Sequence, residues 1–336
     1  MIQSVAELEE FMSRPSAADT AALAALDGDL LILGVGGKMG PTLALRARRA
    51  ASAGKRIIAA ARFSEPGLRE QLEQAGIETH KADLLDPAQL AALPDCANVL
   101  AMFGRKFGST EDPTLTWAMN VYAPGMVCER YKSSRIVAFS SGNVYGYSHV
   151  ARGGSIETDE PHPVGEYAWT GLGRERIYDY HSRRNGTPTV LLRLNYAIDL
   201  RYGVILDIGT QVFERKPIDL SMGAANVIWQ GDANSVALRC FPHAASPATV
   251  INLTGPETLS VRRIAETIGR HLGIEPVFTG AESTDALLNN AQRCQRLFGY
   301  PSVTPEEMME WTAHWLSAGG STLNKPTHFE ARDGKF

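Results

Sequence analysis

Three glycines spaced three residues apart are the first residues in this chain whose pattern suggests chemistry. Gly34, Gly37 and Gly40 follow the apolar run Leu30–Leu33 and precede a helical pattern that has Pro41 in its first turn. In a strand–turn–helix of this kind, the first glycine permits the tight turn, the second admits a pyrophosphate to the backbone, and the third lets the helix pack on the strand. The phosphates would rest on the N–H groups that begin the helix. We therefore predict a dinucleotide site formed by the whole loop: Gly34, Gly36, Gly37, Lys38, Met39 and Gly40.

The residue that follows the second expected strand, 57–61, bears on which dinucleotide binds. A site that selects NAD usually places a carboxylate there, which accepts a hydrogen bond from the ribose 2′-hydroxyl. This chain has Arg62 instead, which could pair with the 2′-phosphate of NADP, and Lys38 could assist it. The alternative is that Arg62 is a solvated residue at a strand end. We predict NADP, with NAD as the second choice, and expect Asp83 and Leu84 to border the adenine.

The elements that must position these residues follow from an alternation of strand and helix patterns that begins at Leu30. Strands are expected at 30–33, 57–61, 78–82, 98–102, 135–140 and 189–194, and the two longest helices at about 114–132 and 167–184. Such alternation predicts an α/β fold, a Rossmann doubly wound parallel sheet with helices on both faces. We assign this dinucleotide-binding domain to residues 28–195.

The remaining segments are expected to surround that domain. Residues 1–27 form an N-terminal helical extension that should pack on the outside of the sheet. After Asn195 the alternation loosens, which predicts a smaller C-terminal substrate lobe from 196–222 and 255–316, while about 223–254 completes the sheet. The polar, glycine-containing residues 317–336 predict a loose tail or one draped over a partner.

Composition excludes several classes of protein. The chain has 336 residues, a net charge of −4 and 44% hydrophobic residues, which argues against binding to nucleic acid or to an anionic membrane. Its four cysteines show no C-x-x-C spacing and no histidine at ligand spacing, so we expect reduced core thiols and no metal site. The acidic N-terminus lacks the apolar run of a signal peptide, and no segment is apolar for long enough to span a bilayer. These features predict a cytoplasmic protein with a small-molecule substrate.

An ordered set of short motifs resembles the extended short-chain dehydrogenase/reductase family, the NAD-dependent epimerase/dehydratase group. The pieces are, in order, the glycine loop 34–40, Asp83-Leu84, Asn120, Ser140-Ser-Gly-Asn-Val-Tyr-Gly146, Glu157-Thr-Asp-Glu-Pro161, Tyr167, Arg193-Leu-Asn195, Asp232 and Asn252-Leu-Thr-Gly255. The resemblance implies a Rossmann domain, a nicotinamide cofactor and a substrate that is often a sugar or nucleotide sugar. It also implies a homodimer that associates through the helices near 114–132 and 167–184.

Site roles follow from the same resemblance, residue by residue. Ser141 matches the serine that hydrogen-bonds the reacting oxygen, and Tyr167 matches the tyrosine that exchanges a proton with it. Asn120 matches the asparagine behind the active site, and Asn195 lies where the family lines the nicotinamide and substrate. Such groups are chemically necessary because a carbon can exchange a hydride only if its oxygen also exchanges a proton.

One departure from the family pattern concerns the lysine that normally follows the tyrosine by four residues. Here that position is Gly171, so the cation beside the tyrosine is missing. Arg174 lies on the same helix face, but about 10 Å further along the axis. Other candidate cations are Lys106, Arg105, His149 and His162, although the sequence favours a surface-loop position over a catalytic role for each of them. Without the lysine, Tyr167 should stay protonated at neutral pH, which favours carbonyl reduction over alcohol oxidation.

These observations support a leading hypothesis and two alternatives. The leading one is an NADP(H)-dependent oxidoreductase that acts on a sugar-like or other polyhydroxylated carbonyl or alcohol. A sugar or nucleotide-sugar epimerase or dehydratase that uses bound NAD(P) is the first alternative. The second is a redox-silent NAD(P)-binding sensor or regulatory protein, which the missing lysine favours and the presence of Ser141, Tyr167 and Asn120 disfavours.

Overall fold

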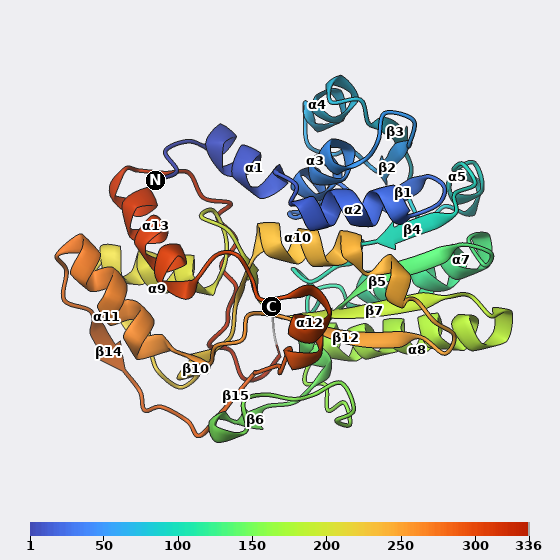
Figure 1. Cartoon of the computed structure of the whole chain (residues 1–336). Coiled ribbons are helices and arrows are strands. Elements are labelled where there is room, and N and C mark those ends of the chain that lie inside the picture. Colours follow the sequence, from blue (N-terminus) through green and yellow to red (C-terminus); the bar gives the residue numbers. More distant parts are fainter. Residues whose placement is uncertain (335–336) are drawn as a thin grey trace.

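A seven-stranded parallel sheet forms the centre of the computed structural model, which describes residues 1–334 (Figure 1). The strand order is β12-β7-β5-β4-β1-β2-β3. The strands are β1 Leu30–Leu33, β2 Ile57–Ala61, β3 Glu78–Lys81, β4 Asn98–Ala101, β5 Arg135–Ser141, β7 Thr189–Leu194 and β12 Thr249–Leu253. Strand β1 pairs in parallel with both β2 and β4, and the strand order reverses between β1 and β4. The predicted Rossmann doubly wound α/β fold is confirmed.

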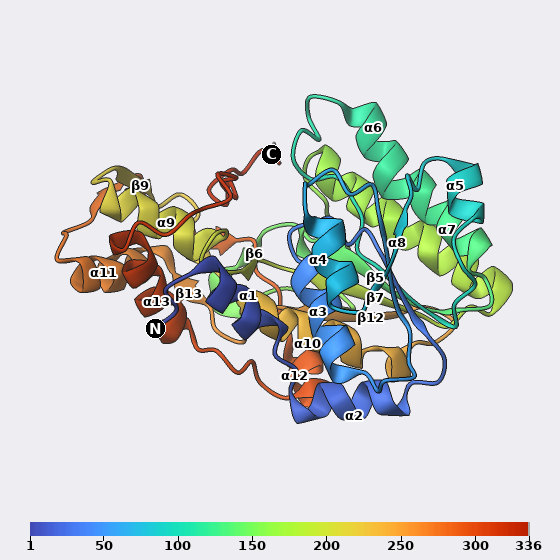
Figure 2. The same cartoon turned by 90° about the horizontal axis from the view of Figure 1, so that it is seen from above.

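Helices cover both faces of the sheet, as Figure 2 shows from above. One face carries α5 Pro87–Ala91, α6 Pro113–Trp117, α7 Ala123–Arg130 and α8 Glu166–Asn185. The other carries α3 Gly40–Ala50, α4 Leu68–Gln74, α10 Gln230–Arg239 and α12 Gln292–Phe298. Along β1, Leu30 and Ile32 belong to the core on the α3 side, whereas Leu31 and Leu33 belong to the core on the α7 side. Burial on both faces explains why the strand sequences are continuously apolar rather than alternating.

A smaller lobe stands beside the carboxyl ends of the strands. Its helices are α9 Val204–Phe213, α11 Val261–Leu272 and α13 Pro305–Ser317, and they share one apolar core. Short paired strands complete it: β6 Ser148–His149 with β15 Asp285–Ala286, β8 Ala197–Ile198 with β11 Ile228–Trp229, β9 Pro217–Asp219 with β14 Val277–Thr279, and β10 Ala224–Ala225 with β13 Leu259–Ser260.

The two terminal segments both pack on the rest of the chain. Helices α1 Val5–Ser13 and α2 Ala17–Ala25 pack on α3 and α10, with Leu23 and Leu26 in the core of that sheet face, and Asp19 pairs with Arg46 at 2.6 Å. At the other end, residues 321–334 are not a loose tail: they pack on their own chain, and Phe329 is buried in the core of the lobe. A single buried aromatic side chain gives this segment an anchor that its polar composition hides. The last two positions of the expected tail, 335–336, lie outside the described residues.

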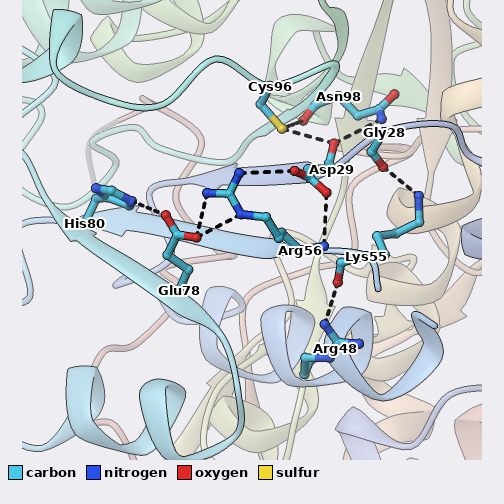
Figure 3. Close-up of polar contacts among 9 residues, drawn as sticks. All are labelled: Gly28, Asp29, Arg48, Lys55, Arg56, Glu78, His80, Cys96 and Asn98. Carbon is cyan, nitrogen blue, oxygen red and sulfur yellow. Dashed lines mark hydrogen bonds and ion pairs between the residues drawn. The ribbon is translucent and has the colours of Figure 1, made fainter. Parts of the chain in front are cut away.

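Polar contacts join the amino ends of the strands, at the edge opposite the lobe (Figure 3). The Arg56 guanidinium pairs with Asp29 at 3.3 Å and Glu78 at 2.7 Å, so it connects the starts of β1, β2 and β3. The Cys96 thiol donates to the Asp29 carbonyl, which also accepts from the Asn98 side chain. All four cysteines are buried free thiols, as predicted. Ligands of open parallel α/β sheets bind at the other edge, outside the carboxyl ends of the strands.

Candidate active site

The glycine loop after β1 has the geometry that its spacing predicts. Gly34 has a φ of +86°, and a Cβ there would lie 2.7 Å from the backbone of Phe103, at the end of β4. A Cβ on Gly40 would lie 2.1 Å from the Val35 carbonyl oxygen, so only glycine lets α3 pack this closely on the strand end. The first and third glycines are therefore required by sterics, whatever the loop binds.

The middle of the same loop fits a dinucleotide pyrophosphate. Gly36 and Gly37 are exposed, and no side chain caps the N-terminus of α3, where a phosphate would be favoured by the helix dipole. Within the loop, the Gly37 and Gly40 N–H groups donate to the Gly34 and Gly37 carbonyls, and Pro41 has no N–H. The loop also lies beside the reversal of strand order between β1 and β4, where ligands of open α/β sheets bind. These residues could hold the two phosphates of a nicotinamide dinucleotide.

Arg62 and Lys38, the two residues predicted to contact a 2′-phosphate, do not point toward a common site. Arg62 is exposed at the end of β2 and takes part in no ion pair within residues 1–334. Lys38 is directed the other way: its Nζ donates to the Ala197 carbonyl at 2.7 Å and lies 4.1 Å from the ring centre of Tyr202. Burial lowers the pKa of Lys38 to about 8. The ammonium group therefore connects the glycine loop to the lobe rather than assisting Arg62.

The other cofactor candidates are placed by local packing. The Asp83 carboxylate accepts from the Leu85 N–H at 3.0 Å and closes a turn, while Leu84 is buried in the core. Met39 is buried as well, against the α3 side of the sheet. Asn195 follows β7 directly, and its side-chain amide donates to Asn226 of the lobe at 2.8 Å. Of these four candidates, Asp83 is the only one whose side chain is not buried.

Ser141 and Tyr167 lie on neighbouring elements at the carboxyl edge of the sheet. Ser141 ends β5, and its hydroxyl donates to the Asn143 side-chain oxygen at 3.0 Å. Tyr167 is the second residue of α8 and is half-buried. Helix α8 packs on the turn Gly142–Val144, and a Cβ on Gly171 would lie 3.5 Å from Val144, an ordinary contact. The structure thus brings the first turns of α8 against the turn that follows Ser141.

Asn120 is fully buried behind these two residues and connects three elements. It lies in a π-helical turn, Ala118–Tyr122, between α6 and α7. Its amide donates to the Thr170 hydroxyl at 2.9 Å, and that hydroxyl donates to the Tyr167 carbonyl at 2.9 Å. Its side-chain oxygen accepts from the Arg105 N–H at 2.8 Å, so Asn120 also fixes the loop after β4. Asn120 therefore links the first turn of α8 to the loop after β4.

A buried ion pair beneath the site escaped the sequence analysis. Arg193 of β7 binds Glu175 of α8 in bidentate fashion, at 2.7 and 2.9 Å, and both side chains are at most 6% exposed. Arg193 also donates to the Tyr145 hydroxyl, and Ser140 donates to Glu175. The available signal was a charged residue inside the apolar strand 189–194, which is rare unless the charge is paired.

The C-terminal segment enters the cleft between the lobe and the sheet. The Thr327 N–H and hydroxyl both donate to the Asp207 carboxylate, at 2.7 and 2.6 Å, and the Thr327 carbonyl accepts from Lys106 Nζ at 3.4 Å. Arg332 donates to two lobe carbonyls, those of Ser221 and Asp285. A small cavity remains between this segment and the residues that precede Tyr167, lined by Asn143, Tyr145, Tyr147, Tyr196, Phe329 and Ala331.

The remaining candidate cations differ in their surroundings. Burial lowers the pKa of Lys106 to about 8. The Arg105 guanidinium donates to the Gly108 carbonyl in its own loop. His149 Nδ1 accepts from the Ala151 N–H, and His162 is exposed beside Gly146. Among residues 1–334 there is no cluster of His, Cys, Asp and Glu that could hold a metal ion, and no helix long and apolar enough to cross a membrane.

Comparison with solved structures reveals a common fold. The UDP-glucose 4-epimerase of Thermotoga maritima, solved with UDP-glucose, matches with a TM-score of 0.71 and 16% identity over 87% of this chain and 99% of that chain. The UDP-glucuronic acid 4-epimerase of Bacillus cereus, solved with UDP-glucuronic acid and NAD, matches with a TM-score of 0.70 and 18% identity over 86% and 99%. The UDP-glucose 4-epimerase of Thermus thermophilus, solved with NAD, matches with a TM-score of 0.69 and 18% identity over 85% of this chain and 98% of that chain.

Comparison of sequences identifies the family. No curated protein matches the chain significantly. The model of the family described as NAD dependent epimerase/dehydratase matches residues 30–197, half of the chain, and this range contains the glycine loop, Asn120, Ser141 and Tyr167. The chain therefore belongs to the NAD-dependent epimerase/dehydratase family of enzymes.

Proposed function

We propose that the protein is an NAD-dependent epimerase or dehydratase of a nucleotide sugar. The observation that carries this proposal is the arrangement of Ser141, Tyr167 and Asn120 at one strand edge, beside a glycine loop shaped for a dinucleotide. The family description and the ligands of the similar structures favour this alternative over net reduction of a sugar by NADPH. They also favour NAD over NADP, since the cofactor in those similar structures is NAD.

The chain's own residues supply proton handling and positioning. When bound, the nicotinamide supplies a reversible acceptor for hydride. Tyr167 acts as the phenolate: it takes the proton of the substrate hydroxyl as that carbon is oxidised, and the resulting phenol returns the proton when the hydride is given back. The Ser141 hydroxyl, which now donates to Asn143 at 3.0 Å, turns to the same oxygen and stabilises the charge that develops there. Asn120 keeps the first turn of α8 in place through Thr170.

A cofactor titration followed by a turnover assay tests this proposal. Binding of NAD⁺, NADH, NADP⁺ and NADPH would be measured separately by calorimetry, and we expect the unphosphorylated pair to bind more tightly. The protein with NAD⁺ would then be incubated with UDP-glucose and UDP-glucuronic acid, and the products resolved by chromatography. We expect conversion of one sugar nucleotide without net formation of NADH, and loss of that conversion in Tyr167→Phe with cofactor affinity retained. Preference for NADPH, abolished in Arg62→Ala, would restore the 2′-phosphate interpretation of Arg62.

The redox-silent alternative has one observation in its favour, the glycine at position 171. The same Tyr167→Phe variant separates the two. A sensor would bind the cofactor equally well with and without the tyrosine hydroxyl and would convert no sugar nucleotide in either form.

We further propose that two copies associate through the outer face of α7 and α8. This face has an open apolar groove whose large side chains include Trp117, Tyr122, Met126, Ile177 and Tyr180. Tyr122 and Tyr180 are 58% and 54% exposed, which is unusual for side chains of this size. A second copy is the occupant that the family resemblance implies. Analytical ultracentrifugation should find a dimer that dissociates in Tyr180→Glu, and a monomeric wild-type protein would contradict the proposal.

A further inference from the structure

Arg174 is a buried cation on the same helix as Tyr167, in a chain that has Gly171 where the family pattern has a lysine. It lies seven residues after Tyr167 on α8, and its side chain is only 7% exposed. Its guanidinium donates to the Asn120 side-chain oxygen at 2.6 Å, to the Phe139 carbonyl at 3.0 Å and to the Asn120 carbonyl at 3.3 Å. The side chain therefore reaches the residue behind the active site, although the helix rise alone suggested that it lies too far away.

Within the described part of the chain, the charge of Arg174 is not paired with an acid. Its acceptors are two backbone carbonyls and one amide oxygen, and no ion pair among residues 1–334 includes it. The adjacent acid, Glu175, is bound to Arg193 instead. A buried cation usually has a carboxylate partner, because desolvation of the charge is costly. An uncompensated cation next to Asn120 therefore places positive potential at the site.

Two neighbouring elements are built around this guanidinium. A Cβ on Gly104, in the loop after β4, would lie 2.3 Å from Arg174 Nη2, so a larger residue there would displace it. In an α-helix the Asn120 carbonyl would accept from residue 124, but this is Pro124, which has no N–H. The π-helical turn at Ala118–Tyr122 and this proline leave the carbonyl available to Arg174.

Hydrogen bonds connect the guanidinium to the Tyr167 backbone, and its other acceptor is a chain neighbour of Ser141. Asn120 donates to Thr170, and Thr170 donates to the Tyr167 carbonyl. Phe139, the other acceptor, lies two residues before Ser141 on β5. We propose that Arg174 is a positioning residue that replaces the missing family lysine from behind the site: it holds Asn120 in place and favours the anionic forms of the reacting groups. This inference rests on the proposed function.

Replacement of Arg174 by methionine tests the role of its charge. With NAD⁺ saturating and a UDP-sugar as the probe, we expect Arg174→Met to lower kcat by about ten- to a hundredfold with little change in KM. The pH at which activity reaches half of its maximum should rise by roughly one unit, because loss of a nearby cation disfavours the Tyr167 phenolate. Arg174→Lys should recover part of kcat. Arg176→Met, two residues away and exposed, is the matched control and should match wild type.

Other charged and titratable groups near the guanidinium also affect the pH profile. These are Arg105, whose N–H shares the Asn120 oxygen, the adjacent Glu175–Arg193 pair, and the buried Tyr178. None of them is altered in the variants, so a change between Arg174→Met and Arg176→Met reports on Arg174. Gly104→Ala provides an independent variant, because its Cβ would push the guanidinium away while leaving the arginine in the chain. It should reproduce the loss in kcat, and its effect should not add to that of Arg174→Met.

The outcomes separate this inference from the proposed function. A wild-type protein that converts no UDP-sugar would refute the proposed function. The effect of Arg174 on Tyr167 would then be measured by NMR titration of protein that carries ¹³Cζ-labelled tyrosine. The Tyr167 resonance is identified as the one that is missing from the spectrum of Tyr167→Phe. The Tyr167 resonance should titrate at higher pH in Arg174→Met than in Arg176→Met. A folded Arg174→Met variant with unchanged kcat, pH profile and tyrosine titration would overturn the inference.

Discussion

The Glu175–Arg193 pair allows a quantitative prediction about the support of the active site. Glu175→Gln keeps the shape of the side chain but removes its charge, so the Arg193 guanidinium stays buried without a carboxylate. The two bonds broken or weakened join Nη2 to Oε2 at 2.7 Å and Nε to Oε1 at 2.9 Å. Loss of one member of a fully buried pair costs about 3–5 kcal/mol of the free energy of unfolding. We expect the lower end, about 3 kcal/mol, because the amide oxygen of the variant and the Tyr145 hydroxyl can still accept hydrogen bonds.

Urea unfolding monitored by circular dichroism would measure this change. Glu73→Gln is the control, because Glu73 pairs with Arg69 on the protein surface and its loss should change stability little. The double variant Glu175→Met/Arg193→Met removes both charges and should be less destabilised than the sum of the two single variants. If Glu175→Gln proved as stable as Glu73→Gln, the pair would not be buried and coupled as the structure indicates, and the reasoning would fail.

Three further predictions concern the loop, the C-terminal segment and pH. Gly40→Ala should weaken NAD binding by about tenfold or more in calorimetry, because its Cβ would lie 2.1 Å from the Val35 oxygen, whereas Gly54→Ala, which meets open space, should bind normally. Thr327→Val should lower the free energy of unfolding by about 1–2 kcal/mol, because the half-buried Asp207 carboxylate loses a donor. Thr322→Val should change it little, because the Thr322 hydroxyl donates to Asn324 at an exposed site. Burial lowers the pKa of Lys38 from 10.5 to about 8, with Asp199, Lys106 and Arg201 facing it. Between these pH values the unfolded chain binds more protons than the folded protein, so the stability of wild type should rise with pH. Urea unfolding midpoints would be measured for wild type and Lys38→Met at pH 7.5 and 9.5. The midpoint of wild type should increase relative to that of Lys38→Met at the higher pH.

What the sequence determined on its own were features that depend on a few consecutive residues. Alternating strand and helix patterns predicted the doubly wound sheet, because the period of the apolar residues reflects which faces are buried. The glycine spacing predicted the loop at 34–40, since Gly34 and Gly40 are required by backbone geometry. The pair Asp86-Pro87 is a local signal of the same kind: the sequence alone indicates a helix start there, and the Asp86 carboxylate accepts from two N–H groups of α5.

Only the tertiary structure decided where the long side chains point and which distant segments meet. Lys38 reaches Ala197, Arg174 reaches Asn120, and Thr327 reaches Asp207, over separations of 159, 54 and 120 residues. A lysine or arginine has several rotamers of similar energy, so its direction is fixed by partners that the local sequence does not name. The helix rise placed Arg174 too far from the site because it counts only backbone distance, whereas the side chain and a π-helical turn bring the guanidinium to Asn120.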